Sequence, residues 1–162
     1  MKYFISDDHW DMDGYWNQLK SLNTRFSKET FNFISNHSFH DANVLELRIS
    51  NTSLLRRTLD PTSVEALVQD IDGYEYLVQW SGVNHIDISF SGKKKVYRSD
   101  KDDDYSLKEE DRRGLEEWAY DEITPVDSTY LQHEITLHSG ACIKIIFRRM
   151  NIKRIRRWCD RS

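Results

Sequence analysis

Histidine and aspartate side chains gather in one short segment of the sequence, SFHDANV at residues 38–44, with His37 directly before it. On a helix, His37 and His40 would share a face because they are three residues apart, and with Asp41 nearby they could hold a metal ion. In a small enzyme, Asp41 could instead orient His40 as a general base. A metal site needs at least one more ligand, and the surrounding sequence nominates none.

A structural interpretation of the same segment competes with both chemical ones. Asp and Asn make local hydrogen bonds to the backbone at turns and helix ends. The segment lies between a helix-like stretch and a strand-like stretch, where the chain needs such a junction. We therefore favour a junction, and we keep His40 and Asp41 as candidate binding residues.

Other titratable residues fall in strand-like patterns. His133 lies on the apolar side of an alternating run, which predicts a buried, neutral imidazole with a satisfied ring nitrogen. His138 falls at a turn. The adjacent Asp121 and Glu122 are the other carboxylates that a small enzyme could use.

Two acidic clusters could serve as ligand sets, but neither has a diagnostic spacing. The first lacks the glycine and the glutamate of a calcium-binding loop, which predicts a solvated segment. The second could mimic phosphate groups for a basic partner, and its members are candidate binding residues. The clusters are Asp7, Asp8, Asp11 and Asp13, and Asp102, Asp103 and Asp104.

Several motifs of known chemistry are absent from the sequence. It contains no GxxxxGK[ST], GxGxxG, GxSxG or HExxH pattern. The sequence therefore favours a protein that is not an enzyme, and it predicts no catalytic residue, no metal site and no cofactor. A small metal-dependent enzyme that uses His37, His40 and Asp41 remains the alternative.

The elements that would position these residues begin with helices in the first third of the chain. Ser27 can cap a short helix over KETFNFISN at residues 28–36. An approximate helical stripe, weakened by Gly14, precedes it. Its members are Trp10, Tyr15, Trp16, Leu19 and Leu22.

From residue 44 onward the hydrophobic period changes to two. In VLELRIS, the side chains of Leu45, Leu47 and Ile49 share one face, which predicts a half-buried strand. Asp72-Gly73 and Ser139-Gly140 predict tight turns of two hairpins. Further strands are expected at residues 85–90 and in the segment LEEWAYDEITPV, where the strand ends at Pro125. Residues 151–158 could form a strand or a short helix.

Short connections between these strands require antiparallel pairing. We predict an α+β fold: a curved or sandwich-like antiparallel sheet of six or seven strands, with N-terminal helices covering its apolar face or one edge. The chain is expected to form one domain over residues 1–162, with a helical or irregular part at 1–37 and a β-rich body at 38–158. The polar stretch 91–114 predicts a long loop or a β-excursion.

Composition narrows the class of protein. The chain has 162 residues, 38% of them hydrophobic, which is enough for one core. Its apolar runs are too short for a signal peptide or a membrane span, so we expect a cytosolic protein with Cys142 and Cys159 as free thiols. Residues 142–162 carry a net charge of +7, but the whole chain carries −4, which argues against a nucleic-acid partner.

The pattern formed by FHDANVLELRIS, YEYLVQWSGV, HIDISF, EEWAYDEI and HEITLHSGACIKIIFRR, over residues 38–150, resembles small cytosolic bacterial proteins. Some of these look like immunity proteins of polymorphic toxin systems. The resemblance implies a non-enzymatic module that binds a partner protein, and an acidic chain suits a basic partner. A self-assembling structural subunit is a further alternative, so the oligomeric state stays open, with a homodimer as one option.

Overall fold

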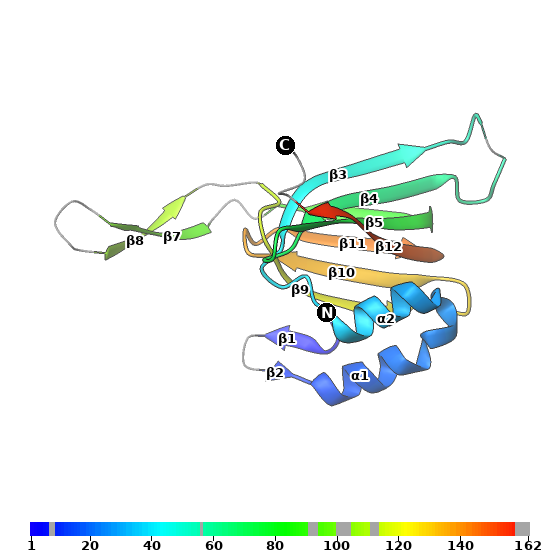
Figure 1. Ribbon diagram of the computed structural model, residues 1–162, viewed down its shortest axis with the longest axis horizontal. Helices are drawn as coiled ribbons and strands as arrows, with labels where there is room; N and C mark the ends of the chain where they lie inside the picture. Colours follow the sequence, from blue (N-terminus) through cyan, green and yellow to red (C-terminus); the bar gives the residue numbers. More distant parts are fainter. Residues whose placement is uncertain (7–8, 56, 91–93, 100–104, 111–113, 158–162) are drawn as a thin grey trace.

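The computed structural model describes residues 1–6, 9–55, 57–90, 94–99, 105–110 and 114–157, with backbone alone at 5, 6, 9, 94–99, 105–110, 156 and 157. Within these ranges, two α-helices accompany eight strands in two antiparallel four-stranded sheets, neither of which closes on itself (Figure 1). This confirms the α+β prediction. The strands number eight because residues 151–157, part of the segment 151–158 that the sequence left open between strand and helix, belong to a strand, and residue 158 lies outside the described residues.

The helices are α1 (Met12–Ser21) and α2 (Lys28–Asn36), joined by a 3-10 turn at Asn23–Arg25. Sheet 1 has the strand order β6-β11-β10-β9, and sheet 2 has the order β12-β5-β4-β3. The strands of sheet 1 are β6 (His85–Ser89), β9 (Trp118–Pro125), β10 (Leu131–Leu137) and β11 (Cys142–Phe147). Those of sheet 2 are β3 (Asn43–Asn51), β4 (Thr62–Gln69), β5 (Tyr74–Val83) and β12 (Arg149–Arg157).

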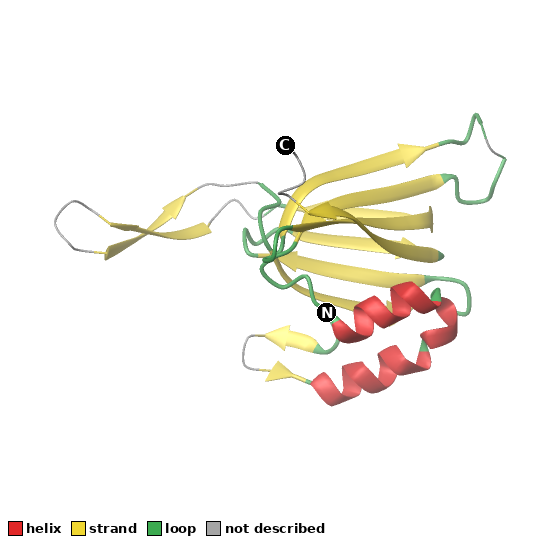
Figure 2. Ribbon diagram, viewed as in Figure 1, coloured by secondary structure: helices red, strands yellow, loops and turns green. Residues whose placement is uncertain are grey.

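Two small hairpins lie outside these sheets (Figure 2). One pairs β1 (Phe4–Ser6) with β2 (His9–Trp10), in a region that the sequence predicted to be helical or irregular. The other pairs β7 (Lys94–Ser99) with β8 (Tyr105–Glu110) and projects away from the sheets (Figure 1). The polar stretch 91–114 therefore contains a β-excursion.

Two long, bent strands that pair with each other join the two sheets. After the single residue Asn84, β5 continues as β6, and after Arg148, β11 continues as β12. The two long strands stay paired on both sides of the bend, β5 with β12 in sheet 2 and β6 with β11 in sheet 1. Gly82 at the bend has φ = +63°, and a Cβ there would lie 3.0 Å from side-chain carbons of Arg148. The bend therefore requires glycine at position 82.

The predicted alternation holds for the inner strands. Buried apolar side chains alternate along β4, β5, β10 and β11, and both predicted hairpin turns are present. The prediction for β3 is wrong in one respect. Leu45 and Ile49 are 44% and 54% exposed, because β3 is the outer strand of sheet 2. The segment is a strand, as expected, but it is not half-buried.

Helix α1 packs against β9, the outer strand of sheet 1, whereas α2 packs against β12, the outer strand of sheet 2 (Figure 1). The helices thus cover sheet edges, which is one of the two placements that the sequence led us to expect. The hydroxyl of Tyr15 on α1 accepts a hydrogen bond from the Ile123 backbone N–H at 3.2 Å, and Gln18 donates to the Ile123 carbonyl at 2.8 Å. Ser27 caps α2 by accepting from the Thr30 N–H at 3.2 Å, as predicted. No helix in the described part of the chain is long and apolar enough to cross a bilayer.

Candidate functional site

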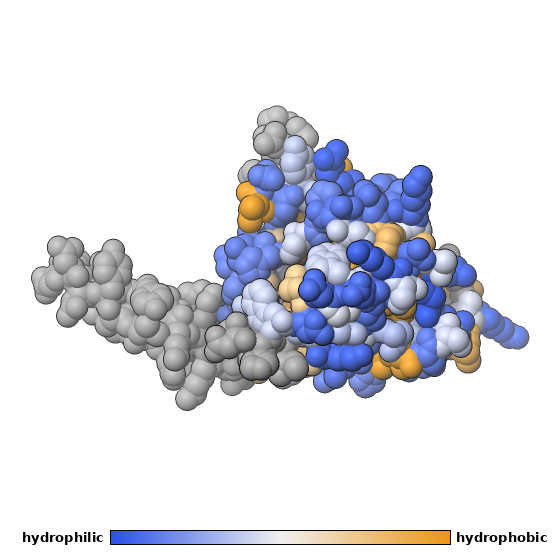
Figure 3. All heavy atoms as spheres, turned by 90° about the horizontal axis from the view of Figure 1, so that it is seen from below, coloured by the Kyte–Doolittle hydropathy of each residue, from blue (hydrophilic) through white to orange (hydrophobic). Residues whose placement is uncertain are grey.

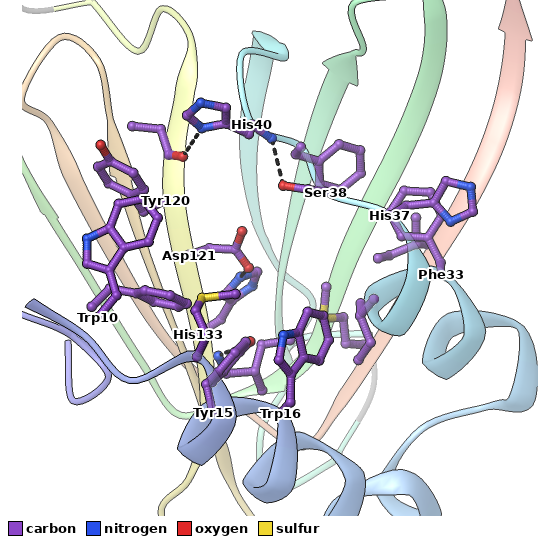
Figure 4. A pocket seen from close by; sticks show the side chains of 18 residues that line it. Trp10, Tyr15, Trp16, Phe33, His37, Ser38, His40, Tyr120, Asp121 and His133 are labelled. Atoms are coloured by element: carbon purple, nitrogen blue, oxygen red, sulfur yellow. Dashed lines mark hydrogen bonds and ion pairs between the residues drawn. The ribbon is translucent and has the colours of Figure 1, made fainter. Parts of the chain in front are cut away.

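A cavity of about 350 Å³ lies between the helices and the strands β9, β10 and β12. Its walls are mainly aromatic, and Asp121 and His133 face it from the strands (Figure 4). None of its lining residues is Lys or Arg, and Asp121 is the one carboxylate among them. The aromatic residues are Phe4, Trp10, Tyr15, Trp16, Phe33, Phe39 and Tyr120.

A chain of hydrogen bonds connects His133 with two tryptophans and one carboxylate. The indole N–H of Trp80 donates to His133 Nδ1 at 3.1 Å. His133 Nε2 lies 2.9 Å from Asp121 Oδ2, and the indole N–H of Trp118 donates to Asp121 Oδ1 at 2.9 Å. Because Nδ1 must accept from Trp80, the proton of His133 is assigned to Nε2, from which it is donated to Asp121.

This chain of hydrogen bonds engages both ring nitrogens of His133. The sequence predicted a buried His with a satisfied nitrogen, and the imidazole is 2% exposed with both nitrogens bonded. A general base needs a free nitrogen within reach of a substrate proton. His133 therefore acts as a structural residue that joins the inner faces of the two sheets, because Trp80 lies on β5 and Asp121 lies on β9.

The adjacent carboxylates Asp121 and Glu122 do not work as a pair. They point to opposite faces of β9, as successive residues of a strand must. Glu122 is buried and accepts hydrogen bonds from the backbone N–H groups of Lys2 and Tyr3, the latter at 2.8 Å. Its role is to fasten the N-terminal segment to sheet 1.

Beside the cavity, the structure brings together His40, Asp41 and His138. Asp41 Oδ1 lies 3.0 Å from His138 Nε2 and 3.6 Å from His40 Nε2. His37, which the sequence grouped with His40 and Asp41, stacks on Phe33 instead, with the ring centroids 4.9 Å apart. The three side chains of the cluster are between 34% and 56% exposed.

The sequence could not assign His138 to this cluster. His138 follows β10, whereas His40 and Asp41 precede β3, and the two places meet only because the start of β3 bridges to Glu117 just before β9. Asp41 also serves as the predicted junction: its φ is +62°, and its N–H donates to the Trp118 carbonyl at 2.8 Å. The junction and cluster interpretations of Asp41 are thus compatible.

The remaining acidic candidates lie partly outside the residues that the structure describes. Asp102, Asp103 and Asp104 lie outside the described residues, as do Asp7 and Asp8. Asp11, from the first acidic cluster, caps α1 by accepting from the Gly14 N–H at 2.9 Å. Cys142 is a free thiol, as expected, whereas Cys159 is outside the described part.

A different candidate surface runs along the outer edge of sheet 2. We call it the edge surface: the strand β3 and the leucines of the following loop. Leu54, Leu55 and Leu59 are 99%, 84% and 79% exposed. On the side of the molecule seen in Figure 3, by contrast, hydrophobic residues form small separate patches among hydrophilic ones.

Comparison of the chain with protein family models, with curated proteins and with solved structures finds no match. The choice between a catalytic site, a ligand pocket and a protein-binding surface therefore depends on the contacts of the described residues.

Proposed function

We propose that this protein is a non-enzymatic binding module of the immunity or inhibitor type, and that a partner protein docks on the edge surface. The observation that carries the proposal is the open side of β3. Over its nine residues β3 pairs with β4 on one side, whereas on the other side its described backbone pairing is confined to Asn43 and Val44. A partner can add a strand there and bury the loop leucines.

Open strand edges promote association, and proteins usually protect them with lysine, proline or bulges. The opposite edge of sheet 2, β12, carries such protection in its basic residues Arg149, Lys153 and Arg154. On β3 the one cation is Arg48, which pairs with Glu46 at 2.8 Å. Beyond a register shift between Val44 and Glu46, the strand is regular. The edge surface thus has fewer protective features than β12, and its register shift lies at one end of the strand.

Charge and chemistry also support binding over catalysis. The dyad most like a catalytic one, Asp121 with His133, is engaged in hydrogen bonds within the protein. The net charge of −4 attracts a basic protein over a distance, which speeds the encounter. The contact itself would come from backbone hydrogen bonds along β3 and from leucine burial.

The test is a comparative pull-down from the native cell extract with mass spectrometry. The bait is the wild-type chain, the double variant Leu54→Asp/Leu55→Asp, or the control Ile71→Asp. Ile71 is 78% exposed in the turn at the other end of β4, so its substitution changes charge without touching the edge surface. We expect one stoichiometric partner with wild type and with Ile71→Asp, reduced about tenfold or more by the double variant, a loss of about 1.4 kcal/mol.

Equal recovery with all three baits would contradict the proposal, because the partner would then bind elsewhere. Concentration-dependent self-association in sedimentation velocity, lost in the double variant, would favour a structural subunit that pairs with its own copy. Partner-free protein with substrate turnover would favour an enzyme.

A second candidate function is binding of a small organic cation in the aromatic cavity. Asp121 is 28% exposed, and the aromatic walls with a single carboxylate suit a quaternary ammonium group. Titration with benzyltrimethylammonium, followed by tryptophan fluorescence, should show saturable binding, whereas the uncharged neopentylbenzene should bind at least about tenfold more weakly. Equal responses to the two compounds would exclude this candidate.

A further inference from the structure

The cluster of His40, Asp41 and His138 has the composition of a metal site. One ligand atom from each residue lies within 4.8 Å of those from the other two. At metal–ligand distances of about 2.0–2.1 Å, ligand atoms around a tetrahedral zinc ion are separated by about 3.4 Å. The distances of 3.0 Å and 3.6 Å from Asp41 Oδ1 to the two imidazoles lie on either side of that value.

The backbone of residues 117–119, at the start of β9, fixes all three residues. His40 Nδ1 lies 2.6 Å from the Ala119 carbonyl oxygen, a contact in which the ring donates its proton. The backbone N–H of Asp41 donates to the Trp118 carbonyl, and that of His138 donates to the Glu117 carbonyl, both at 2.8 Å. Three successive carbonyls, of residues 117 to 119, therefore hold the three ligand-bearing residues in place.

The bond from His40 to Ala119 has a further consequence. A metal-binding histidine generally donates its second ring nitrogen to a carbonyl or carboxylate, which fixes the tautomer and the ring orientation. With Nδ1 committed to Ala119, the lone pair of His40 is on Nε2, the nitrogen that faces Asp41. The imidazole also stacks on Tyr120, with the ring centroids 5.9 Å apart.

The backbone of Asp41, the central residue of the cluster, is strained. Its φ of +62° is a conformation that residues other than glycine rarely adopt, and such strain gathers at functional sites. Asp is one of the residues that tolerate this conformation, which agrees with the junction role but does not exclude a ligand role.

We propose that His40, Asp41 and His138 bind a divalent transition-metal ion, with Zn²⁺ as the ion best suited to two imidazoles and a carboxylate. Three protein ligands leave at least one position for water or for a group from another molecule. Ca²⁺ and Mg²⁺ prefer oxygen-only ligand sets and fit poorly. A bound ion would cross-link the junction before β3 to the turn after β10. This site is independent of the proposed partner-binding function.

The test is isothermal titration of the full chain, purified without a histidine tag and treated with a chelator, with ZnCl₂ as the probe. We expect one Zn²⁺ per chain for the wild type, and at least about tenfold weaker binding for His138→Ala and for Asp41→Asn. The matched control is His37→Ala, which removes a nearby imidazole outside the cluster and should leave the affinity unchanged. Replacement of Zn²⁺ by Co²⁺ should give visible d–d absorption in wild type and in the control.

His138→Ala removes an exposed side chain, so its circular dichroism and urea midpoint should match those of the wild type. Absence of Zn²⁺ binding by the wild type at 100-fold excess of metal would overturn the proposal. Equal affinity of wild type and His138→Ala, or a loss of affinity in His37→Ala instead, would also overturn it.

Discussion

The two outer strands β9 and β3 occupy equivalent places at the ends of their sheets, yet the chain treats them differently. On β9, Trp118 and Ile123 are about 1% exposed, and the backbone of Ile123 is bonded to α1 through both its N–H and its carbonyl. On β3, Leu45 and Ile49 are about half exposed. One edge is part of the folded core, and the other remains available at the surface.

The N-terminal residues account for this difference. They fasten to β9 through the buried carboxylate of Glu122 and through Tyr15 and Gln18, and no described segment does the same for residues 45–51 of β3. A sheet edge can therefore be closed by side chains and a helix without any further strand. Substitutions at matched positions on the two strands should separate stability from association.

The largest difference is expected between Ile123→Ala and Ile49→Ala. Ile123 is packed in the core, so its truncation removes buried methyl groups and leaves a cavity, at a cost of about 2–5 kcal/mol. Ile49 is half exposed, and its truncation should cost about 0.5 kcal/mol. Urea unfolding of both variants measures the two values. Similar losses would show that β3 is as much a part of the core as β9.

Glu122→Gln should have the next largest effect. In wild type, both carboxylate oxygens of Glu122 accept hydrogen bonds from backbone N–H groups. The glutamine amide has one oxygen, so its NH₂ group would face one of these backbone N–H groups and leave it without an acceptor. We expect a loss of about 2 kcal/mol in the free energy of unfolding. Glu46→Gln on β3 is the control, because the ion pair described for that exposed carboxylate is with Arg48 at the surface, and no measurable change is expected. Unchanged stability of Glu122→Gln would argue against this fastening of the N-terminus.

Asp121→Asn is a nearly isosteric change on the inner face of β9. Trp118 and His133 both donate to this side chain, so either orientation of the amide places its N–H₂ against another donor. The expected cost is about 1–3 kcal/mol, measured by urea unfolding. If Asp121→Asn is neutral, the proton of His133 is not on Nε2 and the hydrogen-bond chain must be reassigned.

The smallest effect is expected for Tyr15→Phe, which removes one acceptor for the Ile123 N–H and should cost about 1 kcal/mol at pH 7. The pKa of the Tyr15 hydroxyl is raised well above its usual range, first by burial and then by the Asp121 carboxylate. The folded state therefore keeps a proton that the unfolded state loses above about pH 10, and stability falls as pH rises beyond that value. Unfolding at pH 8 and pH 11 should show a smaller alkaline loss in Tyr15→Phe than in wild type.

Much of the fold could be predicted because it depends on local sequence. Alternation placed His133 inside, and Ser27 marked the start of α2, since both signals come from residues a few positions apart. Burial of β3 could not be predicted, because alternation does not reveal whether another segment covers the strand. Leu45 and Ile49 alternate as core residues do, but they lie at an uncovered edge.

The candidate site was only partly predictable for a related reason. His40 and Asp41 were found because they are adjacent, and His37 was grouped with them by the same criterion of sequence distance. His138 belongs to the cluster through the meeting of β3, β9 and the turn after β10, which is a tertiary contact. The leucines of the loop at 52–61 carry no motif, and only their exposure marks them as part of a surface.

The bent strand pair formed by β5–β6 and β11–β12 has a consequence for how the molecule unfolds. Because each arm belongs to both sheets, separating the strands of one sheet pulls on the ladder of the other at Gly82 and Arg148. The two sheets should therefore lose their structure in a single cooperative transition, with the slowest amide hydrogen exchange along these four strands. This strand pair also brings together Ser81 and Arg149, which are far apart in the chain. Refolding should therefore be slow compared with that of helical proteins of similar size.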